Sequence, residues 1–116
     1  MKKVSKKQSV INRKLKKVYK ELALERPKYC TGCGRNHLAV NLSHSHIIPR
    51  SRRPELQLDK RNITYHCTDS IIGNDVRKGC HSIWESKDRH QLLDYMLNLE
   101  YILEVDAEYY YLISDI

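Results

Sequence analysis

Four cysteines constrain the fold of this 116-residue chain more than any other feature. Cys30 and Cys33 are separated by two residues in a glycine-containing stretch, whereas twelve residues separate Cys67 from Cys80. Two thiolates at the first spacing can bind one tetrahedral ion, and a second pair is needed to close a structural site. We expect all four to bind one structural Zn²⁺, with a partial site as the alternative. A thioredoxin-like redox pair is disfavoured because no βαβ pattern surrounds the first two cysteines.

The length of the chain allows a single modest core, so a bound metal would add useful folding free energy. No apolar run approaches the length of a membrane span, and the N-terminal lysines are not followed by the apolar stretch of a signal peptide. These patterns predict a cytoplasmic protein, or a nuclear one in a eukaryote. In such a reducing compartment, cysteines bind metals more often than they form disulfides.

Charge is distributed unevenly along the chain, which carries a net charge of +7. Residues 1–28 hold eleven Lys or Arg against two acidic residues, whereas residues 85–116 hold two against eight. A basic front half favours a polyanionic partner, most commonly nucleic acid. A membrane surface is the weaker interpretation because the N-terminus lacks a Trp-, Phe- or Leu-rich face. We expect the acidic part to face away from DNA and to offer a surface for a protein partner.

Apolar spacing predicts where the regular elements lie. A lysine-rich arm over residues 1–7 precedes an amphipathic helix that begins near Ser9 and ends before Pro27. Short strands are expected at 38–42 and 62–65, and a loop at 68–79. A helical pattern resumes at 81 and includes a second helix, capped by Asp88, with one apolar stripe of Leu92, Met96, Leu99 and Leu103. Residues 109–113 fit either a strand or a helix end.

Several short motifs follow one another at definite spacings. They are Cys30-x-x-Cys33, then Ser45-His46-Ile47-Ile48-Pro49-Arg50-Ser51, then Leu58-Asp59-x-x-Asn62-x4-Cys67, then Cys80-His81-x-x-Trp84. In this order and spacing, residues 29–86 resemble the HNH endonuclease family.

The resemblance implies an α+β fold with a small ββα-metal, treble-clef-like core and a short β-hairpin. Residues 1–28 would form a basic arm and helix, residues 29–86 the nuclease core, and residues 87–116 a C-terminal helical extension of the same domain. It also implies a metal-dependent endonuclease that hydrolyses phosphodiester bonds in DNA, in a bacterial or phage-infected cell.

The chemistry of phosphodiester cleavage suggests a role for each matching position. A neutral imidazole can remove a proton from the attacking water, and His46 is the candidate general base. A divalent ion, Mg²⁺ or Mn²⁺, would neutralise charge on the scissile phosphate, with His81 as its candidate ligand and Glu85 four residues later on the same helix face. His44 is a further candidate ligand. By the resemblance, Asn62 orients the loop that carries the base. Arginine's forked guanidinium suits phosphate, so Arg50, Arg52 and Arg53 are the candidate DNA contacts.

The chain departs from the family pattern at two places. The family usually has Asp or His immediately before the general base, where this chain has Ser45, and it often has two residues between the last two cysteines rather than twelve. Two alternatives therefore stay open: a zinc-stabilised nucleic-acid-binding module without catalytic activity, and a nuclease that processes recombination junctions. The pattern leaves the oligomeric state undecided.

Overall fold

The computed structural model of the chain describes residues 5–114 and begins with a long helix, α1 (Lys6–Glu25). Ser5 caps α1 by accepting a hydrogen bond from the amide of Gln8, and the extended backbone of Arg26 ends it before Pro27, as the sequence predicts. Residues 1–4 of the expected arm lie outside the described residues. Its last two lysines are helical, because the Ser5 cap starts the helix earlier than apolar spacing indicates.

A central antiparallel hairpin pairs β1 (Leu42–His46) with β2 (Ile63–Cys67), and Ser45 lies opposite Thr64. The expectation of a strand at 38–42 is wrong. Asn36 accepts hydrogen bonds from the amides of Leu38 and Ala39 and folds that segment into a turn. Between the strands, 3₁₀ turns at Pro54–Leu56 and Lys60–Asn62 return the chain to β2.

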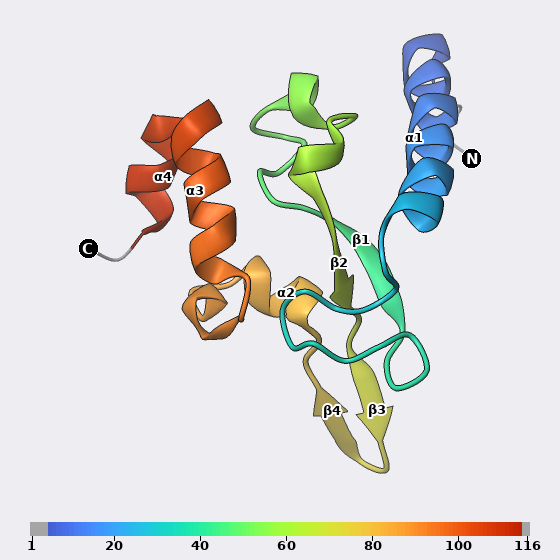
Figure 1. Cartoon of the computed structure of the whole chain (residues 1–116), viewed down its shortest axis with the longest axis vertical. Coiled ribbons are helices and arrows are strands. Elements are labelled where there is room, and N and C mark those ends of the chain that lie inside the picture. Colours follow the sequence, from blue (N-terminus) through green and yellow to red (C-terminus); the bar gives the residue numbers. More distant parts are fainter. Residues whose placement is uncertain (1–4, 115–116) are drawn as a thin grey trace.

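The expected loop at 68–79 contains a second hairpin, β3 (Ser70–Ile72) with β4 (Asp75–Arg77). Gly73 adopts a φ of 64°, which suits the first position of a two-residue hairpin loop. Figure 1 shows this hairpin projecting from the end of β2. It carries the chain out and back between the last two cysteines.

Three further helices follow: α2 (Cys80–Trp84), α3 (Tyr95–Val105) and α4 (Ala107–Ile113). Asp88 precedes only a 3₁₀ turn (Arg89–Gln91), and α3 starts after Asp94. The expected stripe is therefore partly wrong: Leu92 and Leu99 are buried, but Met96 is 68% exposed and Leu103 is 44% exposed. Residues 109–113 are helical, since the side chain of Asp106 caps α4 at the amide of Tyr109.

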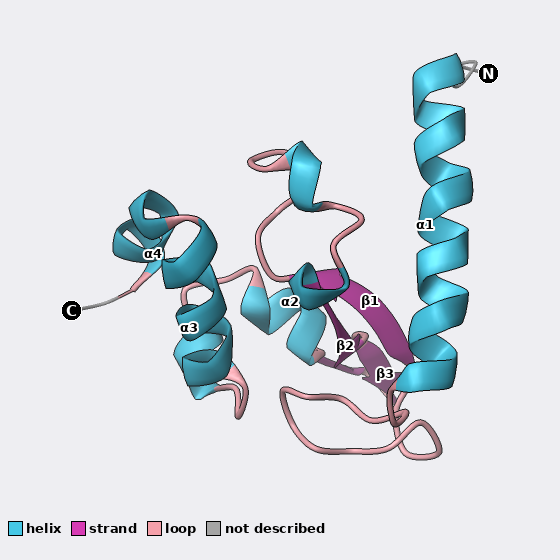
Figure 2. Ribbon diagram, turned by 45° about the horizontal axis from the view of Figure 1, so that its top comes forward, coloured by secondary structure: helices cyan, strands magenta, loops and turns pink. Residues whose placement is uncertain are grey.

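The described residues thus form a small fold of mixed helices and strands, with four α-helices and two two-stranded antiparallel sheets. Figures 1 and 2 show α1 on one side of the β1–β2 hairpin and the α3–α4 pair on the other. The core lies around α2, where Trp84 donates a hydrogen bond to the carbonyl of Ile47 at 3.0 Å. Within residues 5–114, no helix combines the length and hydropathy that a membrane crossing requires.

Candidate functional site

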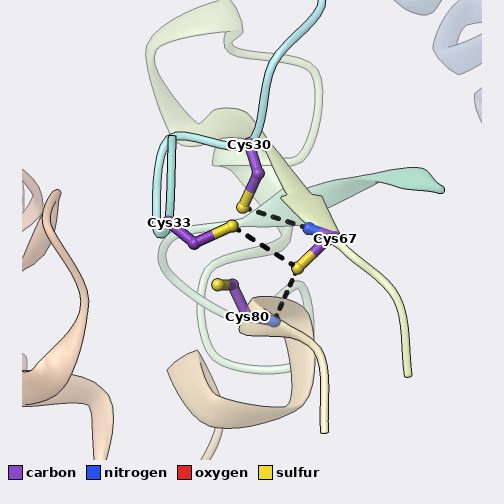
Figure 3. Close-up of side chains that lie close together, drawn as sticks. All are labelled: Cys30, Cys33, Cys67 and Cys80. Carbon is purple, nitrogen blue, oxygen red and sulfur yellow. Dashed lines mark hydrogen bonds between the residues drawn. The ribbon is translucent and has the colours of Figure 1, made fainter. Parts of the chain in front are cut away.

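The four cysteines, far apart in sequence, come together at one point of the fold (Figure 3). Cys30 and Cys33 lie on the turn after α1, Cys67 ends β2, and Cys80 begins α2. All four are free thiols, and their sulfur atoms lie within 4.8 Å of one another. The β3–β4 hairpin makes this possible, because it returns the chain to the end of β2 after twelve residues.

The geometry of this cluster fits a tetrahedral metal ion. Zn–S bonds of about 2.3 Å place sulfur atoms about 3.8 Å apart in a tetrahedral site. The sulfur atoms of Cys33 and Cys67 lie 4.0 Å apart. Backbone amides also donate to the sulfurs, from Cys67 to Cys30 at 3.3 Å and from Cys80 to Cys67 at 3.2 Å. The cluster can therefore hold a structural metal ion, and four thiolates are a donor set that suits Zn²⁺.

The protonation of the cysteines depends on whether a cation is bound. Burial raises the pKa of Cys30 and of Cys80 above the usual thiol value, so in the absence of a cation both would be protonated. Burial also opposes ionisation of Cys33, but hydrogen bonds from the Arg35 amide and neighbouring thiols outweigh it and lower its pKa. A bound cation would compensate the charge of thiolates that burial alone disfavours.

Two glycines allow the segments of the cluster to approach. A Cβ atom on Gly32 would lie 2.8 Å from the Cβ of Cys80, and one on Gly79 would lie 2.3 Å from the carbonyl oxygen of Cys67. Both positions are closed to a side chain because backbone or cysteine atoms fill the space. The close approach of the four cysteines therefore requires glycine at both positions.

A separate cleft of about 560 Å³ lies beside β1, between α1 and α2. His44 and His46 are two residues apart on β1, so their side chains lie on the same face of the hairpin and line this cleft. The lining residues come from five parts of the chain: Tyr19, His44, His46, Pro49, Arg50, His81, Trp84, Glu85, Arg89 and Tyr109. The cleft therefore brings together all three histidines that the sequence singled out for catalysis or metal binding.

His46 is held in one tautomer. Its Nε2 lies 2.9 Å from the carbonyl oxygen of Gln57, and since a carbonyl only accepts, Nε2 carries the proton. Nδ1 is then the unprotonated nitrogen. Burial lowers the pKa of His46, the Gln57 hydrogen bond partly opposes this, and Arg50 and His81 lower it further. At neutral pH the ring is therefore neutral and can accept a proton on Nδ1.

Asn62 is fully buried and fixes the segment that follows β1. Its Oδ1 accepts from the amide of Ile48 at 2.8 Å, and its Nδ2 donates to the carbonyls of Ile48 at 3.1 Å and Leu56 at 3.3 Å. One side chain thus ties the turn after His46 to the 3₁₀ segment that leads to Gln57. The asparagine contacts the polypeptide on both sides of the candidate base and does not line the cleft.

Replacing Asn62 with alanine should destabilise the protein by about 2–4 kcal/mol, because the buried amide and carbonyl of Ile48 lose their partners. Urea denaturation measures this free energy of unfolding. Asn41→Ala is the matched control, since Asn41 is exposed and its side chain makes no hydrogen bond within residues 5–114. Equal stability of the two variants would contradict the role given to Asn62.

The three candidate metal ligands differ in their surroundings. His44 stacks on Tyr19 with ring centroids 3.8 Å apart, and its Nε2 is buried without a hydrogen-bond partner. Burial lowers the pKa of His44, and His46 lowers it further. His81 places Nδ1 3.0 Å from the hydroxyl of Ser43 and Nε2 3.2 Å from a carboxylate oxygen of Glu85.

These histidines do not form a closed ligand set. Within the described part of the chain, the four cysteines are the only group of three or more potential ligands gathered at metal-binding distance. Ser45 contributes nothing to the cleft: it is 1% exposed, lies on the face opposite His44 and His46, and leaves its hydroxyl without a partner. Its place in the family pattern is thus occupied by a buried core side chain.

The candidate phosphate contacts divide into two kinds. Arg50 lines the cleft and is exposed. Arg52 pairs with Asp106 at 2.9 Å, and Arg53 pairs with Glu55 at 2.5 Å and with Asp106 at 3.5 Å. The acidic C-terminal part therefore neutralises two of the three arginines internally. Of these three, Arg50 is the one directed to the cleft.

The structure adds residues that sequence patterns did not single out. Tyr19 of α1 forms one wall of the cleft, where its ring stacks on His44. The hydroxyl of Ser43 donates to the carbonyl of His66 at 2.8 Å and contacts His81. Gln57 acts through its backbone carbonyl, which no residue pattern reveals. Arg89 lies over the Trp84 ring at 5.5 Å and completes the rim.

Comparison of the chain with protein-family models, with curated proteins and with solved structures gave no match. Its function is therefore inferred from these residues and their geometry.

Proposed function

We propose that this protein is a metal-dependent DNA endonuclease of the HNH type, with a ββα-metal core formed by β1, β2 and α2. The observation that carries the proposal is the state of His46. A neutral imidazole with its proton fixed on Nε2 by the Gln57 carbonyl presents an unprotonated Nδ1 in a cleft rimmed by arginine.

In this proposal Nδ1 of His46 takes the proton of the water that attacks the scissile phosphorus. The attack breaks the bond to one ester oxygen, which takes a proton from solvent water and leaves as an alcohol. Arg50 offsets the charge of the phosphate at the mouth of the cleft. Asn62 acts as a positioning residue, because it holds the turn after His46 without touching the reacting atoms.

In this proposal His81 and Glu85 would hold a divalent cation. The Ser43 hydroxyl gives its proton to the His66 carbonyl, so it accepts the one on Nδ1 of His81. Nε2 lies 3.2 Å from a carboxylate oxygen of Glu85, so the two side chains could hold a divalent cation together or share a proton. Neighbouring ligands of an octahedral Mg²⁺ lie about 3.0 Å apart. Once bound there, the ion would supply charge neutralisation at the phosphate.

The test is a nicking assay on supercoiled plasmid with zinc-loaded protein. We expect nicked or linear DNA when Mg²⁺ or Mn²⁺ is added and intact plasmid when neither is present. Glu85→Gln should raise the metal concentration needed for half-maximal cutting by about tenfold or more, whereas Glu108→Gln, an exposed residue of α4, should leave it unchanged. Cutting that needs no divalent ion would contradict the metal-assisted mechanism.

One observation favours a second candidate, a zinc-stabilised nucleic-acid-binding module without catalytic activity. Ser45 is buried where the family has a metal ligand, and the cleft histidines form no closed ligand set. This candidate predicts DNA binding without cutting under any divalent metal. The same plasmid assay, run beside a binding measurement, separates the two.

A further inference from the structure

Helix α1 carries a continuous row of positive charge that no acidic side chain of residues 5–114 neutralises. At about 100° per residue, five of its basic residues fall within an arc of about 100° on the side opposite the buried Leu15 and Leu22. We call this arc the basic face of α1; it consists of Lys6, Arg13, Lys16, Lys17 and Lys20. All five side chains are exposed, and none forms an ion pair with residues 5–114.

Some basic residues in the middle of the chain are paired with acidic side chains instead. Lys60 pairs with both acidic residues of α1, Glu21 at 3.0 Å and Glu25 at 2.7 Å. Arg61 pairs with Glu104, and Arg52 pairs with Asp106. The middle of the chain thus satisfies much of its positive charge internally. The acidic residues of α1 face Lys60, which leaves the opposite side of the helix uniformly positive.

The basic face adjoins the cleft. Tyr19 lies between the buried side of α1 and the basic face, and its ring stacks on His44 in the cleft wall. Lys16 is one turn before Tyr19, and Lys20 follows it directly. From Lys6 to Lys20 the row extends about 21 Å along the helix axis.

We propose that the basic face of α1 binds the phosphate backbone of double-stranded nucleic acid and guides it into the cleft. This inference rests on the proposed function only for the identity of the ligand. The nucleic acid that α1 binds would be the one whose phosphodiester bond reaches His46. A duplex carries one charge per about 1.7 Å of its axis, so a 21 Å row of cations faces many phosphates at once.

Two other anionic partners fit the helix less well. A helix that lies on a membrane buries its apolar side in lipid, but Leu15 and Leu22 of α1 are already buried in the protein. The acidic helices of a second copy are also poor partners. Two of their acidic residues, Glu104 and Asp106, already hold Arg61 and Arg52.

The test measures binding to a fluorescent 30-base-pair duplex without divalent ions, so that no strand is cut. Each phosphate contact contributes about 0.9 to the slope of log K against log salt. Arg13→Gln/Lys16→Gln/Lys20→Gln should therefore reduce the steepness of that slope by about 2–3. The matched control Lys28→Gln/Arg35→Gln/Lys87→Gln removes the same charge from exposed residues elsewhere and should change it by less than about 1.

Equal changes of the slope in the two triple variants, or no change in the first, would overturn the proposal. Circular dichroism checks that α1 stays helical in both variants. Binding to phosphatidylglycerol vesicles as tight as binding to the duplex would overturn it in favour of a lipid surface. A new dimer that the first triple variant abolishes would assign the face to a second copy. If plasmid is never cut but the slope changes as expected, the proposed function fails and the binding surface stands.

Discussion

Removing the metal from the four-cysteine cluster should lower the free energy of unfolding by about 5 kcal/mol or more, enough to unfold much of the chain at 37 °C. The cluster joins the turn after α1, the end of β2 and the start of α2, and three of its cysteines belong to the core. Loss of a bound ion would remove a link that all three segments share. We expect thermal unfolding followed by circular dichroism to shift to much lower temperature after treatment with a zinc chelator.

The control for this experiment is re-addition of zinc. Wild-type protein should recover its unfolding temperature, whereas Cys80→Ser, which lacks one thiolate, should recover little of it. Elemental analysis of protein purified without chelator should give about one zinc per chain. Protein that contains no metal and unfolds at the same temperature with or without chelator would show that the cysteines are only core residues.

The sequence predicts the end of the first helix and the cysteine cluster correctly, but it misjudges segment 68–79 and the buried side of the C-terminal helices. The first helix ends where the Arg26-Pro27 pair requires, and the cysteine spacing correctly brings four residues to one place. Segment 68–79 is misjudged because its composition is typical of loops. The pairing of Ile71 with Val76 across the Gly73 turn is a local preference that composition does not reveal.

Errors in the C-terminal helices have a different cause. Leu92, Met96, Leu99 and Leu103 repeat at helical spacing, but Met96 and Leu103 are largely exposed while Asn98 is buried. Tertiary packing decides which side of α3 is covered, and α3 lies against a core that a single helical pattern cannot locate. The spacing of apolar residues therefore predicts the helical region correctly but assigns the wrong residues to its buried side.

Part of the candidate site was accessible from sequence and part was not. His44, His46, His81 and Glu85 were singled out by residue type and spacing, and the fold places all four in one cleft. The tautomer of His46 depends on a backbone carbonyl eleven residues away, which has no signature in side chains. The burial of Ser45 likewise depends on tertiary contacts. The same is true of the ion pairs that Arg52 and Arg53 form with Asp106.

His46→Ala should lower the rate of plasmid nicking by about 10²–10⁴-fold, because it removes the group that accepts the proton of the attacking water. The affinity for duplex DNA should not change, since the basic face of α1 does not include this residue. Single-turnover nicking with saturating Mg²⁺ measures the rate. His37→Ala is the matched control, because His37 is exposed and does not line the cleft.

The pH profile distinguishes a base from a merely structural histidine. Since burial lowers the pKa of His46, the wild-type rate should be constant at neutral pH and fall only below pH 6.5, where the ring gains a proton and loses its basic Nδ1. The variant should lose this acidic limb together with its rate. If His44→Ala abolishes the limb and His46→Ala keeps it, the base is His44. If neither substitution changes the rate, neither His44 nor His46 acts as the general base.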